Sequence, residues 1–292
     1  MISNPSVAVL LAAYNGMDWI EEQILSILSQ KNTSIKIFIS VDLSNDKTHQ
    51  WCQSLAANNA RIQVLPYGEE FGGAARNFFR LIRDVVSSDF DYIALSDQDD
   101  IWESGKLQHA IRVIEKNNLD GYSSDVIAFW SNGRERLVKK SSPQKKFDYF
   151  FEAAGPGCTY VLKQHSLQKF KKFLINNWRE INLIESHDWL IYAFFRSRNM
   201  PWYIDNKPLM LYRQHELNQV GSNFGFLAYL KRIKMIKNGW YRSEVGKIAK
   251  VISINDGRLS LDKWTLIKKF YLLRRQRRDA FILLLMITFG IF

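Results

Sequence analysis

Strand-like and helix-like patterns alternate along the first 116 residues of the chain. Short apolar runs, typical of buried strands, lead into polar turns and then into stretches with apolar residues at helical spacing. The predicted strands cover residues 7–13, 35–41, 62–65 and 92–95, and the predicted helices cover residues 19–30, 48–58, 72–86 and 103–116. This order indicates β-α-β units with right-handed crossovers. We therefore expect an α/β fold, with a Rossmann-like, mainly parallel sheet flanked by helices.

The pattern is less regular after residue 120. Short strands are predicted at residues 126–129, 202–205 and 209–213, and helices at residues 167–178 and 187–196. The charged stretch 133–146 predicts an exposed loop. Gly155-Pro156-Gly157 predicts a tight turn, because glycine tolerates backbone angles that other residues avoid.

Charge divides the chain into two parts. Residues 1–225 contain 25 Lys/Arg and 25 Asp/Glu, whereas residues 226–278 contain 15 Lys/Arg and only three acidic residues. Asp279 completes the formal net charge of +11. We expect a neutral domain over residues 1–225, with a ligand-binding half at about 1–105 and a second half at about 106–225, and a basic, helical C-terminal region over residues 226–292.

The C-terminal region ends in an uncharged apolar segment, residues 280–292. Thirteen residues of helix reach about 20 Å, short of the roughly 30 Å of a bilayer's hydrocarbon core. Beside the basic cluster Arg274, Arg275, Arg277 and Arg278, this segment predicts an anchor on an anionic membrane surface. The alternative is a helix that packs on the protein or on another copy. A nucleic-acid partner is not expected, because the apolar end has no role there.

Cysteine usage and the amino terminus bear on the compartment. The two cysteines, Cys52 and Cys158, match no metal or redox spacing, which indicates a reducing environment. The first residues lack the basic stretch and long apolar run of a secretory signal. We expect a cytoplasmic protein, peripheral on the inner face of the cytoplasmic membrane.

Three carboxylates stand directly after the predicted strand 92–95: Asp97, Asp99 and Asp100. Open α/β sheets bind ligands outside the carboxyl ends of their strands. Crowded carboxylates at such a position call for a hard divalent cation that is shared with substrate phosphates. The alternative is that one aspartate caps the helix predicted from residue 103.

Polar turns follow all four predicted parallel strands, or stand close behind them, and should converge at one edge of the sheet. They are Tyr14-Asn15-Gly16, Asp42–Asp46, Gly72–Asn77 and Asp97–Asp100. Ala12–Gly16, Asp42–Asp46 and Ser96–Trp102 together resemble the family 2 glycosyltransferases of the GT-A fold. His187-Asp-Trp189 and Tyr212-Arg-Gln-His215 are similar to motifs of its bacterial rhamnosyltransferase-like branch. The resemblance extends from about residue 7 to 221.

The resemblance implies roles for residues of the nucleotide half. Ala13, Tyr14 and Asn15 would flank the base of a nucleotide-sugar donor. Asp42 would accept a hydrogen bond from the N3–H of the pyrimidine, although Val41 stands where the family usually has a further acid. The other residues are Arg76, near the base or a phosphate, Asp97, near the ribose, and Asp99, which would bind the cation. For Asp46 we expect only a turn or capping role.

The second half of the domain also contains candidate functional residues. The resemblance places His215 as a second ligand of the cation, Mg²⁺ or Mn²⁺, and Arg213 or Gln214 at a phosphate. For His215, the alternative is a structural role in a loop. Asp188 is the expected base that takes the proton from the acceptor hydroxyl, with Glu185 and His187 as alternatives. Three residues are candidates for the wall of the sugar pocket: Trp102, Gly157 and Trp189.

These features predict a metal-dependent, inverting glycosyltransferase. The resemblance implies dTDP-β-L-rhamnose as donor and a lipid-linked saccharide as acceptor, in the synthesis of O-antigen or another cell-surface polysaccharide. One alternative is transfer of galactose or glucose from a UDP-sugar. The other is a non-catalytic module that binds a membrane surface or a polyanion. The pattern leaves the oligomeric state undetermined.

Overall fold

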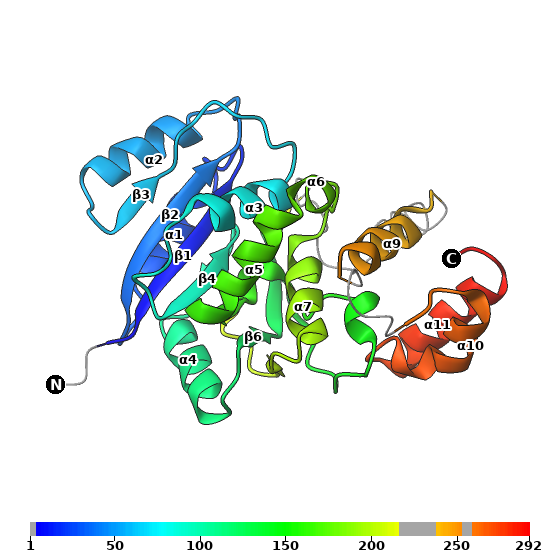
Figure 1. The fold of residues 1–292 in the computed structure, drawn as a ribbon. Coiled ribbons are helices and arrows are strands. Elements are labelled where there is room, and N and C mark those ends of the chain that lie inside the picture. Colours follow the sequence, from blue (N-terminus) through cyan, green and yellow to red (C-terminus); the bar gives the residue numbers. More distant parts are fainter. Residues whose placement is uncertain (1–3, 216–237, 253–258) are drawn as a thin grey trace.

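The computed structural model describes residues 4–215, 238–252 and 259–292, and its first part alternates strands and helices as predicted (Figure 1). The elements up to residue 116 are β1 (Ser6–Ala13), α1 (Ile20–Leu28), β2 (Ser34–Val41), α2 (Thr48–Ala57), β3 (Ile62–Val64), α3 (Ala74–Asp84), β4 (Tyr92–Ser96), β5 (Ile101–Trp102) and α4 (Lys106–Lys116). Those from residue 121 to 214 are β6 (Gly121–Ser124), β7 (Val126–Trp130), β8 (Glu135–Val138), η1 (Asp148–Phe150), η2 (Gly157–Thr159), β9 (Val161–Lys163), α5 (Gln164–Asn176), α6 (Trp178–Ile181), α7 (His187–Ser197), β10 (Trp202–Asp205) and β11 (Met210–Gln214).

A seven-stranded sheet forms the centre, in the order β10-β6-β9-β4-β1-β2-β3. Only β9 runs antiparallel to its neighbours, so the expected mainly parallel sheet is confirmed. Helices cover both faces. Alternate residues of β1 point into two cores, one shared with α3, α5 and α7 and the other with α1, α2 and α4. The apolar run of β1 follows from this, because both of its faces are buried.

A second sheet, in the order β5-β11-β7-β8, lies beside the acidic turn. Met210 and Leu211 of β11 pair with Trp102 and Ile101 of β5. Strand β5 ends directly before residue 103, where the sequence predicts the start of a helix, and α4 begins only at Lys106. The cap of α4 is Gly105 without a side-chain hydrogen bond, so the alternative that an aspartate of the turn caps this helix is wrong.

Other short strands were not predicted. The stretch expected to be an exposed loop contains β8, which pairs with β7. Strands β6 and β9 also escaped prediction, because Gly-Tyr-Ser-Ser and Val-Leu-Lys carry no alternation that indicates a strand. Their place in the sheet is decided by long-range pairing, which local sequence does not encode.

The C-terminal region is helical and packs against the rest of the chain. Its elements are α9 (Trp240–Ile252), α10 (Lys263–Lys269), η4 (Phe270–Leu272) and α11 (Arg277–Thr288). The expected domain boundary at residue 225 lies outside the described residues. Buried residues of α9 and α11 join the core that contains α7, so the C-terminal region is attached to the second half of the chain.

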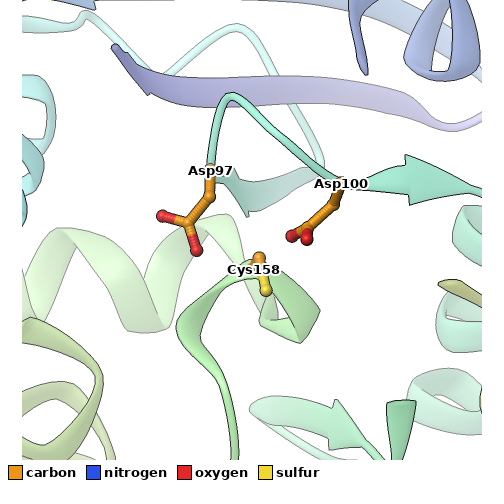
Figure 2. A group of neighbouring side chains, drawn as sticks. All are labelled: Asp97, Asp100 and Cys158. Atoms are coloured by element: carbon orange, nitrogen blue, oxygen red, sulfur yellow. The ribbon is translucent and has the colours of Figure 1, made fainter. Parts of the chain in front are cut away.

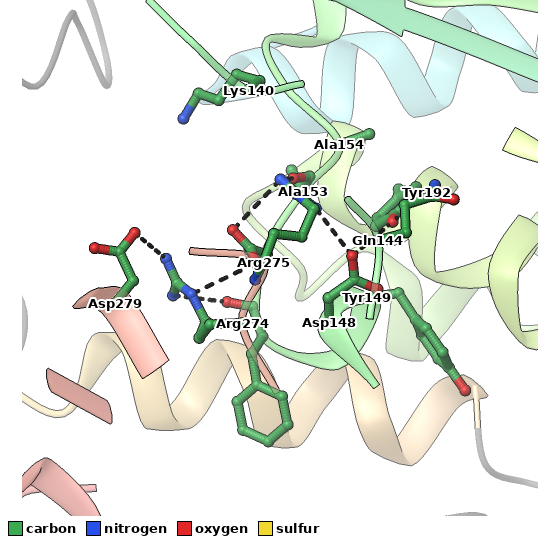
Figure 3. Close-up of polar contacts among 12 residues, drawn as sticks. Lys140, Gln144, Asp148, Tyr149, Ala153, Ala154, Tyr192, Arg274, Arg275 and Asp279 are labelled. Carbon is green, nitrogen blue, oxygen red and sulfur yellow. Dashed lines mark hydrogen bonds and ion pairs between the residues drawn. The ribbon is translucent and has the colours of Figure 1, made fainter. Parts of the chain in front are cut away.

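The basic cluster was expected to lie at a membrane, but two of its arginines point toward the protein instead. The side chain of Arg275 is 3% exposed and forms ion pairs with Asp148 and Glu152. Arg274 pairs with Glu152 and donates to the Phe151 carbonyl at 3.1 Å (Figure 3). These contacts between 147–153 and 274–275 attach the tail, so only Arg277 and Arg278 of the cluster are exposed.

Helix α11 both packs on the protein and presents an apolar face. Ala280, Leu283 and Ile287 are buried, whereas the opposite side exposes large apolar side chains. The exposed set is Phe281, Ile282, Leu285 and Phe289. Within the described residues, no helix has the length and apolar character needed to span a bilayer.

Candidate active site

The acidic turn emerges from the buried end of β4 and meets the start of η2. Gln23 of α1 donates to the Ser96 hydroxyl at 2.9 Å, and that hydroxyl donates to the Asp97 carbonyl at 2.8 Å. Below this turn, ligand atoms of Asp97, Asp100 and Cys158 all lie within 4.8 Å of one another (Figure 2). Two carboxylates and a thiol are thus gathered where the sheet ends.

Burial and mutual repulsion disfavour the simultaneous ionisation of these acidic groups. Burial, together with the charge of Asp99, raises the pKa of Asp97 to about 7 and the pKa of Asp100 well above its usual range. Burial also raises the pKa of the Cys158 thiol well above its ordinary value. Burial also lowers the pKa of the neighbouring Lys106 to about 7. Burial and mutual repulsion thus shift these groups toward their neutral forms.

Asp99 and His215 meet directly. The His215 Nε2 lies 2.8 Å from the Asp99 Oδ2, and the imidazole stacks on Trp19 with 3.9 Å between ring centroids. Arg213 Nε donates to the Asp99 carbonyl at 2.8 Å, and the Arg213 amide donates to Asp100 Oδ1 at 3.2 Å. Strand β11 thus brings two predicted residues to the turn from more than 110 positions away.

The turns after β1, β2 and β4 are tied together by hydrogen bonds. Gln98 accepts from the Tyr14 amide and donates to the Tyr14 carbonyl, both at 2.8 Å. Asn15, in the left-handed region with a φ of 46°, accepts from the Asn45 amide at 2.8 Å. The predicted convergence of these turns is confirmed. The Tyr14 ring is left half exposed beside them, with 51% of its surface accessible.

Asp42 and Arg76 organise the loop that precedes α3. The Asp42 carboxylate accepts from the amides of Phe71 at 2.7 Å and Gly72 at 3.1 Å, and the Asp42 amide donates to the Ala13 carbonyl at 2.8 Å. Arg76 donates to the carbonyls of Phe71 and Asn182. Both side chains therefore have structural partners, and their contacts with a nucleotide remain predictions.

Asp46 has the turn role that was expected of it. Its carboxylate accepts from the Thr48 amide at 2.9 Å and the Met17 amide at 3.2 Å. These hydrogen bonds hold its pKa below the usual range, although burial acts the other way. The side chain thus joins the turn after β1 to the start of α2.

Asp188 lies in the first turn of α7, opposite η2. A Cβ added to Gly157 would stand 2.4 Å from His187 Nε2 and 3.3 Å from Asp188 Cβ, so only glycine allows this approach. Burial raises the pKa of Asp188 to about 6, and its charge in turn raises the pKa of Asp97. Asp188 therefore shares an electrostatic environment with the acidic turn.

The two alternative bases have less suitable surroundings. Burial lowers the pKa of His187 to about 3, and its ring stacks on Phe78 at 4.0 Å between centroids. This imidazole is too weak a base for efficient proton transfer near neutral pH. Glu185 accepts a hydrogen bond from Trp240 Nε1 at 2.7 Å and points toward the C-terminal region. The surroundings thus favour Asp188.

Several residues of the site were not predicted. Gln98 stands inside the acidic motif, yet its clamp on Tyr14 depends on two strands lying side by side. Cys158 and Lys106 reach the cluster from other elements, and only the Gly155-Pro156-Gly157 turn gave a signal near Cys158. Trp102 is buried beneath the Lys106 ammonium, 3.6 Å from ring centroid to nitrogen, so its expected place in a sugar pocket is wrong.

A mainly parallel sheet covered on both faces, with an acidic turn after β4, matches the GT-A fold expected from the sequence. The glycosyl transferase family 2 model matches residues 8–192, and the chain belongs to this family. It is 49% identical over 289 residues to the dTDP-rhamnosyl transferase RfbG of Shigella flexneri, covering 97% of this chain and 100% of that protein. The chain is thus a glycosyltransferase of the rhamnosyltransferase-like branch.

More distant proteins share parts of the sequence or the fold. A β-1,3-glucosyltransferase of Escherichia coli, WfgD, whose name gives UDP-Glc and α-D-GlcNAc-diphosphoundecaprenol as substrates, is 27% identical over 55% of this chain and 61% of its own. Staphylococcus aureus TarS 1–349 in complex with UDP superposes with a TM-score of 0.59 at 15% identity, covering 95% and 75%. The Pyrobaculum calidifontis mannosyltransferase PcManGT, in complex with GDP-Man and Mn²⁺, has a TM-score of 0.51 at 13% identity, covering 98% and 84%. These two structures support the fold alone.

Proposed function

We propose that the protein transfers L-rhamnose from dTDP-β-L-rhamnose to a hydroxyl of a lipid-linked saccharide, with inversion and with a divalent cation. The observation that carries this proposal is the meeting of Asp97, Asp99, Arg213 and His215 after β4, in a chain 49% identical to RfbG over nearly its full length. The product belongs to a cell-surface polysaccharide such as O-antigen.

Asp99 and His215 fit the role of cation ligands. The Asp99 Oδ2 and His215 Nε2 lie 2.8 Å apart, so one cation could be held by both side chains. Carboxylate oxygen with imidazole nitrogen suits Mn²⁺ and also accepts Mg²⁺. When bound there, such an ion would supply Lewis-acid stabilisation of the diphosphate leaving group.

The nucleotide binds across the turns after β1 and β2. Tyr14 offers an exposed ring for the face of the base, between Ala13 and Asn15. Asp42 accepts from the N3–H of thymine with the lone pairs that the loop amides leave, since a carboxylate has about four acceptor positions. Asp97 lies toward the ribose. Arg76 lies beside the loop that precedes α3, and Arg213 lies beside the acidic turn after β4. These two side chains contact a phosphate or the base.

Asp188 accepts the proton of the acceptor hydroxyl as that oxygen attacks the anomeric carbon. With a pKa of about 6 the carboxylate is mostly ionised at neutral pH, yet is a better base than an exposed aspartate. The bond to the diphosphate breaks as the new bond forms, which inverts the configuration. The raised pKa of Cys158 keeps its thiol protonated and disfavours a covalent intermediate on this residue.

The exposed face of α11 serves to bring the protein to its lipid-linked acceptor. Phe281, Leu285 and Phe289 project from one side of this helix, and exposed basic side chains flank it on α10 and at its start. The basic set is Lys263, Lys268, Arg277 and Arg278. Apolar insertion with basic residues around it suits an anionic leaflet, here the inner face of the cytoplasmic membrane. The acceptor named for WfgD, a diphosphoundecaprenol, supports this choice.

The proposed functions divide among the two predicted halves of the domain and the C-terminal region. Residues 1–105 bind the nucleotide and cation, residues 106–225 supply Asp188 and the acceptor side, and residues 226–292 meet the membrane. The attachment of the tail through residues 147–153 and α7 supports placing it on the acceptor side.

A donor panel tests the proposal. Purified protein is incubated with a polyprenyl-diphosphate-linked saccharide, Mg²⁺ and one donor at a time: dTDP-rhamnose, UDP-galactose or UDP-glucose. We expect release of nucleoside diphosphate, and a heavier acceptor, with dTDP-rhamnose. Preference for a UDP-hexose would replace the donor assignment. Binding to anionic vesicles without turnover of any donor would favour the non-catalytic module.

A further inference from the structure

A carboxylate of the C-terminal region is buried against the start of the helix that carries Asp188. Glu244 of α9 has no exposed surface. Its Oε1 accepts from the amides of Glu185 at 2.7 Å and Ser186 at 3.0 Å, and its Oε2 lies 3.2 Å from Lys247 Nζ. Burying a carboxylate is costly unless hydrogen bonds compensate it, and these contacts provide them.

These contacts meet a local need of α7. The first amides at a helix start have no partners within the helix, and a side chain at the N-cap usually supplies one. The N-cap of α7 is Ser186, which makes no side-chain capping bond. Glu244, 58 residues further along the chain, instead fixes the backbone that leads into His187 and Asp188.

The tail also reaches Asp188 by a second route. Tyr160 donates its hydroxyl hydrogen to the Asp188 carbonyl at 3.1 Å and accepts from the Ala154 amide at 3.2 Å. The carbonyl of the adjacent Ala153 accepts from Arg275 Nη2 at 2.6 Å (Figure 3). The backbone of Asp188 is therefore linked to the C-terminal region on two sides.

Charged and titratable groups of several elements face Asp188. Lys140 attracts its negative charge, whereas Glu244 repels it. Asp97 and the Tyr160 hydroxyl each respond to the Asp188 charge, while His187, its neighbour, stays neutral near pH 7. Glu244 and Lys140 thus act on the Asp188 carboxylate with opposite sign.

We propose that Glu244 is a positioning residue for Asp188, so that the C-terminal region is a working part of the catalytic unit as well as a membrane contact. The proposal rests on the proposed function, in which Asp188 is the base. Removal of the Glu244 carboxylate lets the start of α7 move. A displacement of about 1 Å at a catalytic group lowers turnover by up to about 100-fold.

Two substitutions separate the geometric and electrostatic effects. Glu244→Ala removes the acceptor of both amides, and we expect kcat to fall about 10-fold to 100-fold with the KM for donor unchanged. Glu244→Gln keeps an acceptor oxygen but removes the charge. We expect it to retain most of kcat and to move the acid side of the kcat–pH profile to lower pH, because Asp188 then loses a repelling neighbour.

Two control variants show whether the shift is specific to charges near Asp188. Lys140→Met removes the attracting charge and should move the acid limb of the kcat–pH profile to higher pH. Lys250→Ala, on the exposed side of α9, should leave the acid limb at its wild-type pH. Rates are measured with a short water-soluble acceptor analogue, so that membrane binding does not enter. Hydrogen exchange of the peptide covering residues 184–192 should rise in Glu244→Ala.

The outcomes distinguish this inference from its premise. A wild-type kcat in a folded Glu244→Ala, or an acid limb at its wild-type pH in Glu244→Gln, together with an inactive Asp188→Asn, would overturn the role of Glu244 alone. Full transfer by Asp188→Asn would reject Asp188 as the base, and the inference with it. If Glu244→Ala does not fold, the kcat–pH profile of Glu244→Gln still tests the influence of Glu244 on Asp188.

Discussion

Replacement of Asp188 by asparagine is the sharpest test of the proposed chemistry. The change keeps the size of the side chain and an acceptor oxygen for the Trp189 amide, which the carboxylate binds at 2.7 Å. It removes the ability to take a proton. General-base catalysis contributes about 100-fold to 10,000-fold, or about 3–5 kcal/mol of activation free energy. We expect kcat to fall by that factor with donor affinity unchanged.

The pH dependence of kcat in the wild-type protein gives a second, independent test of Asp188 as the base. Asp188 must be ionised to act, and burial places its pKa at about 6. About nine-tenths of the protein is then active at about pH 7 and about one-tenth at about pH 5, a tenfold loss of rate on acidification. Saturating Mg²⁺ and donor keep Asp97 ionised through the attraction of the cation, so that the limb reports Asp188.

The assay follows release of dTDP in initial-rate conditions, with donor affinity measured by calorimetry. Transfer by Asp188→Asn at the wild-type rate would refute the assignment of the base. A wild-type rate that stays constant between about pH 7 and pH 5 would refute the effect of burial on this carboxylate.

Three further predictions concern the cation, the tail and the membrane. Exhaustive EDTA treatment should stop turnover and Mn²⁺ should restore it; turnover that persists would contradict the Asp99 and His215 assignment. Arg275→Met should lower the free energy of unfolding by about 3 kcal/mol, because a buried aspartate partner loses a cation; an unchanged thermal transition would argue against that pairing. Replacement of Phe281, Leu285 and Phe289 by serine should release the protein from anionic vesicles in co-sedimentation, while exposed Lys116→Ser should not.

The sequence predicted the elements whose patterns are local. Strands β1 and β4 appear as apolar runs because both of their faces are buried, and β2 appears as an alternating stretch. Helix α7 was predicted within one residue. The strands β6 and β9 and the pairing of β5 with β11 depend on partners far away in the chain. No window of sequence contains those partners, so local patterns could not predict them.

The same distinction holds for the site. Asp97 and Asp99 could be predicted from their place after an apolar strand, and the resemblance added Arg213 and His215, which the structure brings to the same turn. The dependence of the Asp188 helix on Glu244 could not be foreseen, because a glutamate on an amphipathic helix usually faces solvent. Its burial becomes visible only when α9 is packed against α7.

The most direct test of the account is the mass of the product formed from dTDP-β-L-rhamnose and a polyprenyl-diphosphate-linked saccharide in the presence of Mg²⁺. We predict that the wild-type protein adds one deoxyhexose to the acceptor and that Asp99→Ala adds none while remaining folded. An unmodified acceptor with the wild-type protein, or equal addition by Asp99→Ala, would contradict cation-assisted rhamnosyl transfer at this turn.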